Sequence, residues 1–293
     1  MTDKAGDIIF FMRAAWLHSP SYSPLFWLGD QLVSWDRYDG IKSVLTSALS
    51  GGISGHSLTH SDIGGYTMEE VGPIHYTRSQ ELLLRWIELS AFGSCLFRSH
   101  IGSSQSTSNV QIYDNYITMS HFAYFSKIFK FLASYRFVLM KEAELLGYPV
   151  MRPMAMHYAY DPVSWSLSDQ FMFGSEFLVA PVLDPINPSF YGIKGSEMVY
   201  EKGSKIMMIK VYIPYSSEWI HLWSGASVSG EREEEREEER EREKVRERGR
   251  WIHVPARIGE PPVFYKKESV WGKKLREFVL LEREKERERE RNE

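Results

Sequence analysis

The stretch WLGDQLVSWDRYDGIKSVLTSALSGGISGHSLTHSDIGGY, residues 27–66, holds two apolar runs that each end in a carboxylate beside glycine. The first run ends at Asp30 and the second at Asp62. Between them the sequence predicts a helix that begins at Asp39 and ends at Gly51–Gly52. This order is typical of a parallel βαβ unit. It predicts acids at the carboxyl ends of neighbouring strands, where (β/α)₈ barrels place their catalytic residues.

The same order of strand, loop and helix recurs four times before residue 150. The predicted strands cover residues 7–15, 25–29, 52–60 and 95–99, and the predicted helices cover residues 39–50, 79–92 and 115–146. Most of these strands are short and apolar throughout, as in a parallel sheet buried on both faces, and the third is rich in Gly and Ser. The sequence therefore predicts an α/β fold with a partial (β/α)₈ TIM barrel, since a closed barrel needs eight strands.

Beyond residue 150 the pattern changes to strand-like runs separated by Pro, Gly, Asp and Asn. These runs are PMAMHYAY (153–160), QFMFGSEFLVAPVL (170–183), KIMMIKVYIP (205–214), EWIHLW (218–223) and PPVFYKK (261–267). They predict an antiparallel β-sandwich module. We therefore expect a barrel half at residues 1–150, a β-sandwich domain at 151–275 and a charged tail at 276–293.

Two runs of Glu and Arg lie in the C-terminal part, at residues 231–250 and from residue 282 to the end. Arginines four residues apart among glutamates allow i,i+4 ion pairs, so the first run predicts a solvated single helix. Charged a and d positions disfavour a coiled coil. Composition favours a solvated insertion over a partner-binding arm.

Composition excludes several classes of protein. The 293 residues carry a formal net charge of −4, which argues against nucleic acid as a partner. Cys95 is the only cysteine, so the chain has no intrachain disulfide. No apolar run is long enough to span a bilayer, and the N-terminal run lacks a signal-peptide cleavage site. We expect a cytoplasmic protein with no membrane partner, and a homo-oligomer stays open.

Asp30 and Asp62 are the candidates for acid–base chemistry. Asp30 follows a strand and a glycine beside Trp27, and a carboxylate against an aromatic wall can donate a proton near neutral pH. The glycines after Asp62 let a ligand approach the backbone closely. Either carboxylate could instead cap the following helix. Two of them on one predicted rim favour function over capping.

Basic residues follow two of the predicted strands. Arg98 and His100 share one side of a strand end, where they could bind sugar hydroxyls or pair with Asp62 as structure. Arg13 has the same two interpretations. His56, His60 and Asp62 could imitate a metal site, but their glycine- and serine-rich context indicates a strand and loop rather than a helix face. The sequence predicts neither a metal nor a cofactor.

Six segments together resemble glycoside hydrolase family 31. They are FWLGDQ (26–31), GISGHSLTHSDIGGYT (52–67), ELLLRWIELSAF (81–92), FRSH (97–100), PVMRPMAMHY (149–158) and FLVAPVL (177–183). The resemblance runs from about residue 7 to residue 275, interrupted by the first charged run. It implies a retaining α-glycosidase with a (β/α)₈ barrel and β-sandwich domains. GDQ together with HSDIGGY resembles the sulfoquinovosidase branch, which cleaves α-sulfoquinovosides such as sulfoquinovosyl glycerol.

The resemblance also implies roles for single residues. Asp30 matches the general acid/base of the family. Asp62, Arg98 and His100 match residues that hold sugar hydroxyls. Arg13 and Trp27 match pocket residues, and Gln31 and Tyr66 match positions of the sulfosugar branch, where the tyrosine helps to bind the sulfonate.

One element of the family pattern is missing. The family's nucleophile is an aspartate on the fourth barrel strand in a DFGE-like motif, and no such motif occurs in the chain. A retaining glycosidase needs two carboxylates about 5 to 5.5 Å apart. We therefore expect a C-terminal fragment that is inactive alone. The alternatives are a non-catalytic protein that binds a sugar or a partner, and an α-glucosidase of the same family.

Overall fold

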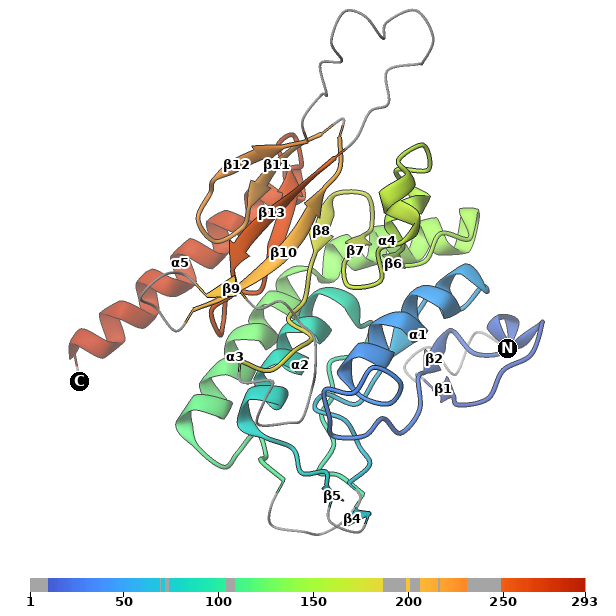
Figure 1. Cartoon of the computed structure of the whole chain (residues 1–293), viewed down its shortest axis with the longest axis horizontal. Helices are drawn as coiled ribbons and strands as arrows, with labels where there is room; N and C mark the ends of the chain where they lie inside the picture. Colours follow the sequence, from blue (N-terminus) through green and yellow to red (C-terminus); the bar gives the residue numbers. More distant parts are fainter. Residues whose placement is uncertain are drawn as a thin grey trace, which may run out of the picture. The chain divides into compact units, whose positions relative to one another are not determined.

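The computed structural model describes residues 10–68, 70–71, 74–103, 109–186, 199–200, 206–215, 217–230 and 249–292 (Figure 1). The chain forms two compact units. The first contains Met1–Ser126 and Arg136–Met151, and the second contains Lys127–Tyr135 and Arg152–Glu293. Most of the first charged run, residues 231–248, lies outside the described residues, and with it the predicted solvated helix.

The first unit is built on a three-stranded parallel sheet. Its strands are β1 (Phe11–Met12), β2 (Leu25–Trp27) and β3 (Thr59–His60), in the order β1-β2-β3. The short hairpin strands β4 (Glu70–Val71) and β5 (Ile74–His75) and the 3₁₀ turn η1 (Ser19–Ser21) complete its minor elements. The helices are α1 (Ile41–Ile53), α2 (Gln80–Gly93), α3 (Tyr116–Phe131) and α4 (Ala133–Leu146), of which α3 and α4 continue into the second unit.

The first helix of the sequence prediction is right in kind and wrong at both ends. Gly40, not Asp39, is the N-cap of α1, and Ser43 Oγ accepts from the Gly40 amide at 3.1 Å. The helix continues through Gly51 and Gly52. A Cβ on Gly52 would lie 2.9 Å from Pro149 Cβ, so this glycine permits close packing and does not end the helix. Gly55, with φ +98°, follows the actual end.

The other predicted strands of this unit are shorter or absent. Since α1 runs to Ile53, the strand expected at 52–60 is reduced to β3. The strand expected at 95–99 is a single parallel bridge between Ile63 and Ser99. Ser94 Oγ bonds to both the amide and the carbonyl of Leu96, which offers this backbone an alternative to a ladder.

The helix predicted at 79–92 is confirmed as α2, with Ser79 as its N-cap and Ser79 Oγ accepting from Leu82 N. Its residues from Leu82 to Gly93 are all buried, so the helix has no solvent-exposed face over this length. The helix predicted at 115–146 is divided at Leu132 into α3 and α4. Gly147, with φ +74°, ends α4 as expected.

The second unit contains two antiparallel sheets. The larger has the order β12-β11-β14-β8-β7-β6, and the smaller has the order β13-β10-β9. The strands are β6 (Met151–Arg152), β7 (Phe171–Phe173), β8 (Phe177–Val179), β9 (Val199–Tyr200), β10 (Met207–Ile213), β11 (Glu218–His221), β12 (Ser227–Ser229), β13 (Arg250–Pro255) and β14 (Val263–Lys266). One core cluster contains Leu178, Trp219 and Phe264 of the larger sheet with Val211 and Val254 of the smaller.

Three features of this unit depart from the sequence prediction. PMAMHYAY is not a strand, because Pro153 lacks an amide and the 3₁₀ turn η2 (Met154–Met156) follows it; a second turn, η3 (Pro162–Trp165), comes next. The prediction missed β13, which begins at Arg250 inside the run expected to be solvated. It also missed α5 (Val270–Asn292), whose Leu275 and Val279 are buried, so no separate tail begins at residue 276.

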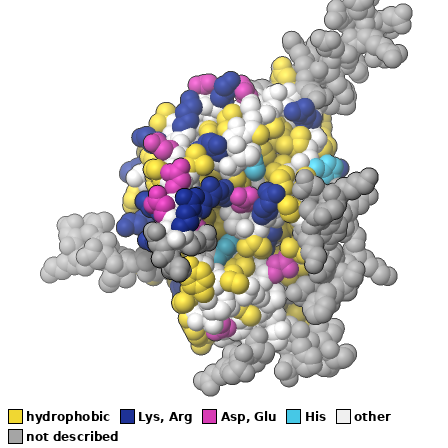
Figure 2. Space-filling view, turned by 90° about the vertical axis from the view of Figure 1, so that its left-hand side faces the viewer, with side chains coloured by type: hydrophobic (Ala, Val, Ile, Leu, Met, Phe, Trp, Pro, Cys, Tyr) yellow, Lys and Arg dark blue, Asp and Glu magenta, His cyan; other side chains and the backbone are white. Residues whose placement is uncertain are grey.

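The second Glu/Arg run forms the end of α5. Glu282 pairs with Lys127 at 2.6 Å and with Lys285 at 2.8 Å, and Arg283 pairs with Glu260 at 2.7 Å. On the face shown in Figure 2, basic and acidic side chains lie next to one another. In the part of the chain that the structure describes, no helix has both the length and the hydropathy of a membrane span.

Candidate functional site

The first group of predicted site residues surrounds Asp30, which lies three residues beyond β2. Arg13 Nη2 is 3.2 Å from Asp30 Oδ2, and the Arg13 guanidinium carbon lies 5.4 Å from the centroid of the Trp27 ring. The Asp30 side chain is 25% exposed and that of Arg13 is 66% exposed. The structure thus gathers three predicted residues, Asp30, Arg13 and Trp27, into one group whose carboxylate a ligand can reach.

The second group surrounds Asp62, two residues beyond β3. Arg98 Nη1 donates to Asp62 Oδ1 at 2.7 Å, and His60 Nε2 lies 3.7 Å from the same oxygen. The Asp62 side chain is 2% exposed. A buried carboxylate with one charged donor is held in one orientation, so Asp62 is suited to accept a hydrogen bond in a fixed direction.

Neither carboxylate caps a helix. The N-cap of α1 is Gly40 and that of α2 is Ser79. Trp27 and His60 are partners in the parallel register of β2 and β3, so Asp30 and Asp62 follow adjacent strands at the same edge of the sheet. The structure therefore excludes the capping interpretation that the sequence left open.

Tyr66 and His100 form a third contact. Their rings meet edge to face with centroids 4.7 Å apart. The Gly102 amide donates to His100 Nδ1 at 3.1 Å, which leaves the hydrogen of a neutral imidazole on Nε2. His100 thus carries a donor for a ligand oxygen beside the phenol of Tyr66.

Gln31 connects the two loops through its backbone. Its carbonyl oxygen accepts from the amides of Tyr66 and Thr67, each at 2.9 Å. Its side-chain Nε2 donates to Leu28 O at 2.6 Å, whereas Oε1 is buried without a hydrogen-bond partner. Trp27 Nε1 is also buried without a hydrogen-bond partner. Buried polar atoms without partners are uncommon and require an explanation, of which a polar ligand is one.

Sequence reasoning missed Arg78, whose side chain holds the backbone beside His100. Arg78 is 1% exposed and donates to His100 O at 2.8 Å, to Val110 O at 2.8 Å and to Gln111 Oε1 at 2.8 Å. Burial lowers the pKa of its guanidinium to about 10, so it stays charged at neutral pH. No periodicity or motif predicted a role for this arginine, because it lies outside α2, the helix that the apolar pattern predicted.

Metal ligands do not gather in the described part of the chain, where no group of three His, Cys, Asp or Glu side chains could hold an ion. His56, the first member of the alternative metal set, stacks on Phe26 with ring centroids 4.5 Å apart. Of the two cavities described for this chain, one of about 10 Å³ borders His60 and Ser61. The other, of about 390 Å³, lies in the second unit and contains none of the predicted site residues.

Comparison with known proteins gives a consistent result. Residues 2–140 match the family model described as "Glycosyl hydrolases family 31 TIM-barrel domain", and residues 147–271 match "Glycosyl hydrolase family 31 C-terminal domain". A sulfoquinovosidase of Agrobacterium fabrum is 35% identical over 266 residues, which are 91% of this chain and 34% of the relative. A sulfoquinovosidase of Escherichia coli is 37% identical over 274 residues, 92% of this chain and 33% of the relative.

A solved structure agrees with these relatives. It is a GH31 family sulfoquinovosidase from E. rectale in complex with an aza-sugar inhibitor, with a TM-score of 0.73 and 34% identity. The similarity covers 94% of this chain and 35% of that one. The chain thus spans about a third of the length of the relatives it matches.

Proposed function

Because the chain belongs to glycoside hydrolase family 31, we propose that its first unit contributes the acid/base half of a site that hydrolyses α-glycosides with retention. The observation that carries this proposal is the pair of carboxylates at the ends of adjacent parallel strands, with Asp30 accessible and Asp62 fixed. Asp30 protonates the leaving oxygen and then deprotonates water. Asp62, Arg98 and His100 hold sugar hydroxyls.

The proposed substrate is an α-sulfoquinovoside. Support comes from the two relatives named sulfoquinovosidase and from Gln31 and Tyr66, which the Gln31 carbonyl links through a hydrogen bond. Arg13 and Trp27 line the pocket beside Asp30 in this proposal. A plain α-glucoside is the competing substrate, and a direct comparison of the two as chromogenic glycosides decides between them.

In architectural terms, we assign the first unit to strands five to eight of the barrel and the second to the β-sandwich domain that follows. A retaining mechanism needs a second carboxylate as nucleophile. The family's DFGE-like motif is absent from the 293 residues, so in this proposal the chain supplies the proton shuttle and needs a nucleophile-bearing segment to act. A cytoplasmic location remains a prediction.

The test uses a chromogenic α-sulfoquinovoside with two proteins: the 293-residue chain, and the same chain joined to the nucleophile-bearing barrel segment of a sulfoquinovosidase relative. We expect no turnover by the chain and measurable turnover by the joined protein. Asp30→Asn in the joined protein should lower kcat by a factor of about 10² to 10⁴, the usual contribution of general acid–base catalysis. Turnover by the 293-residue chain that Asp30→Asn abolishes would disprove the need for a further segment.

Sugar binding without turnover is a second candidate, favoured by the Asp62–Arg98 pair that forms within the chain alone. Saturable binding of the free sugar by the 293-residue chain, weakened by His100→Ala, would support it. Glu144→Gln is a control, because this exposed carboxylate pairs with Lys141 on α4 and contacts none of the predicted site residues in the interactions described. If the 293-residue chain bound no sugar, this second candidate would be excluded, and the catalytic proposal would be tested with the joined protein alone.

A further inference from the structure

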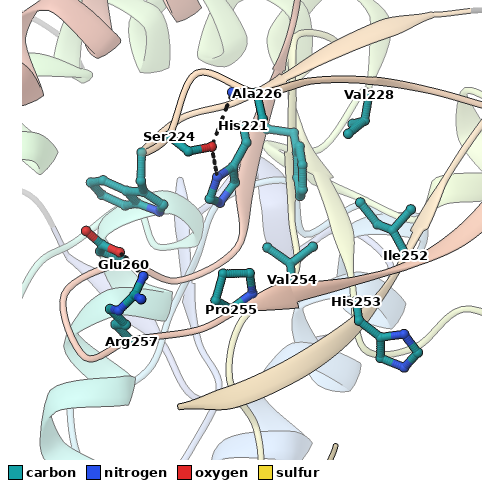
Figure 3. Close-up of a pocket in the computed structure, with 12 residues that line it drawn as sticks. His221, Ser224, Ala226, Val228, Ile252, His253, Val254, Pro255, Arg257 and Glu260 are labelled. Atoms are coloured by element: carbon teal, nitrogen blue, oxygen red, sulfur yellow. Dashed lines mark hydrogen bonds and ion pairs between the residues drawn. The ribbon is translucent and has the colours of Figure 1, made fainter. Parts of the chain in front are cut away.

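A cavity of about 390 Å³ opens in the second unit, between the outermost strands of its two sheets. Its walls include Ala226 and Val228 at β12, the last strand of the larger sheet, and Ile252 and Val254 on β13, the last strand of the smaller (Figure 3). Pro255 and Phe264 extend the apolar wall. Ligand pockets in proteins have volumes of about 300 to 1,000 Å³ and walls of this composition.

One buried polar atom in this cavity lacks a partner. His221 is 7% exposed, and its Nε2 makes no hydrogen bond. Figure 3 draws the imidazole between Ser224 on one side and Val254 and Pro255 on the other. A buried polar group without a partner destabilises the protein that contains it, so a ligand that satisfies it would be stabilised at this point.

The hydrogen bonds around His221 define the role of this atom. Ser224 Oγ accepts from the Ala226 amide at 3.2 Å and lies 2.8 Å from His221 Nδ1. The Ser224 hydroxyl has Nδ1 within reach as an acceptor, so we assign its hydrogen there and the imidazole hydrogen to Nε2. Burial, against the opposing charge of Glu260, lowers the pKa of His221 to about 4, so the ring is neutral at physiological pH. Nε2–H is therefore a neutral hydrogen-bond donor without an acceptor.

Charged side chains form the opposite end of the polar wall. Glu260 Oε1 is 2.7 Å from Arg283, and Glu260 Oε2 is 3.7 Å from Arg257. The two arginines outweigh the single carboxylate in charge, so this end disfavours a cationic head group. A head group with hydroxyls suits both ends, because a hydroxyl accepts from an imidazole N–H and donates to a carboxylate.

We infer that this cavity is a second binding site, for a small amphiphile with a hydroxyl-bearing head and an aliphatic body. The head contacts His221 and Glu260, and the body lies along Val228, Ile252 and Val254. The site belongs to the second unit and does not rest on the function proposed for the first. An acyl or alkyl chain attached to a polyol or sugar has this chemistry.

The experiment titrates the 293-residue chain with octyl β-D-glucoside below its micelle concentration and follows the imidazole ¹⁵N resonances of His221. We expect saturable binding that shifts the Nε2 resonance. Glucose, which lacks the aliphatic body, and octanoate, which lacks the hydroxyl head, should each bind at least tenfold more weakly. If glucose bound as tightly as octyl glucoside, the apolar wall would not bind the aliphatic body. If octanoate bound as tightly, the site would not require a hydroxyl-bearing head.

Three variants separate the site from the fold. Ala226→Trp fills the cavity from an exposed position and should weaken binding at least tenfold, whereas Ser229→Trp places the same side chain on β12 outside the cavity wall and should not. His221→Phe removes the unsatisfied nitrogen and should weaken binding about tenfold without lowering the melting temperature. Failure of the octyl glucoside to bind, or binding that Ala226→Trp leaves intact, would overturn the inference.

Discussion

The loop after β2 and the loop after β3 each place a carboxylate at the same edge of a parallel sheet, beside positive-φ glycine and paired with an arginine from another segment. They differ in how firmly the carboxylate is held. Asp62 is 2% exposed and Asp30 is 25% exposed. The partner of Asp62 is 2.7 Å away and 43% exposed, and the partner of Asp30 is 3.2 Å away and 66% exposed. The loop after β3 thus holds its carboxylate in place, and the loop after β2 leaves its carboxylate accessible to solvent.

The glycines sharpen this difference. Gly64 has φ +91°, and a Cβ there would lie 2.6 Å from Arg78 Cδ. Gly29 has φ +98°, and its nearest contact would be Gln31 Nε2 at 3.9 Å. Both need a conformation that other residues adopt with strain, but only Gly64 also lacks room. The loop after β3 is thus packed against a buried arginine, and the loop after β2 is not.

The largest expected effect is that of Gly64→Ala. The strain of positive φ and the overlap with Arg78 together should lower the free energy of unfolding by about 3 kcal/mol. Gly29→Ala carries the strain alone and should cost about 1 kcal/mol. Urea unfolding followed by circular dichroism measures both variants. Equal losses would show that Arg78 does not restrict the loop.

The arginine partners give a smaller contrast. Arg98→Ala leaves Asp62 buried without its charged donor and should cost about 2 kcal/mol, less than for a fully buried pair because Arg98 is itself half-exposed. Arg13→Ala removes an exposed partner and should cost about 0.5 kcal/mol. The free energy of unfolding in urea is again the measurement. Arg98→Lys should recover part of the loss, and a loss for Arg13→Ala as large as that for Arg98→Ala would refute the contrast.

Periodicity predicted much of this arrangement, and local contacts decided the rest. The strand before Asp30 and the helix α2 follow directly from short apolar runs and a Ser N-cap. The end of α1 does not, because Gly51 and Gly52 have the composition of a stop signal while Pro149, a residue distant in sequence, makes Gly52 a packing glycine. The sequence prediction also missed β13 and α5. Both lie next to or within charged runs, which were predicted to be solvated, although Val254, Leu275 and Val279 are buried.

The candidate site shows the same limit. Strand position left Arg98 with a sugar hydroxyl or Asp62 as its partner, and the structure shows the pair with Asp62. It gave Arg13 the same two alternatives, whereas Arg13 pairs with Asp30. Motif and strand position did not predict that Arg78 holds the His100 backbone, or that Asp62 is buried and Asp30 is not. Depth of burial depends on residues from several segments that meet only in the fold, so the structure, and not the sequence, distinguishes the accessible carboxylate from the buried one.

The smallest effect is also the most specific test of the comparison: the salt dependence of the two ion pairs. A double-mutant cycle of Arg13→Ala and Asp30→Ala should give a coupling of about 0.5 kcal/mol at low salt, and it should vanish in 1 M NaCl, where the Debye length falls to about 3 Å. The cycle of Arg98→Ala and Asp62→Ala should keep most of its coupling, because the buried Asp62 is screened far less. If both couplings fell together with salt, the two carboxylates would share one environment, and burial could not separate a proton shuttle from a fixed ligand group.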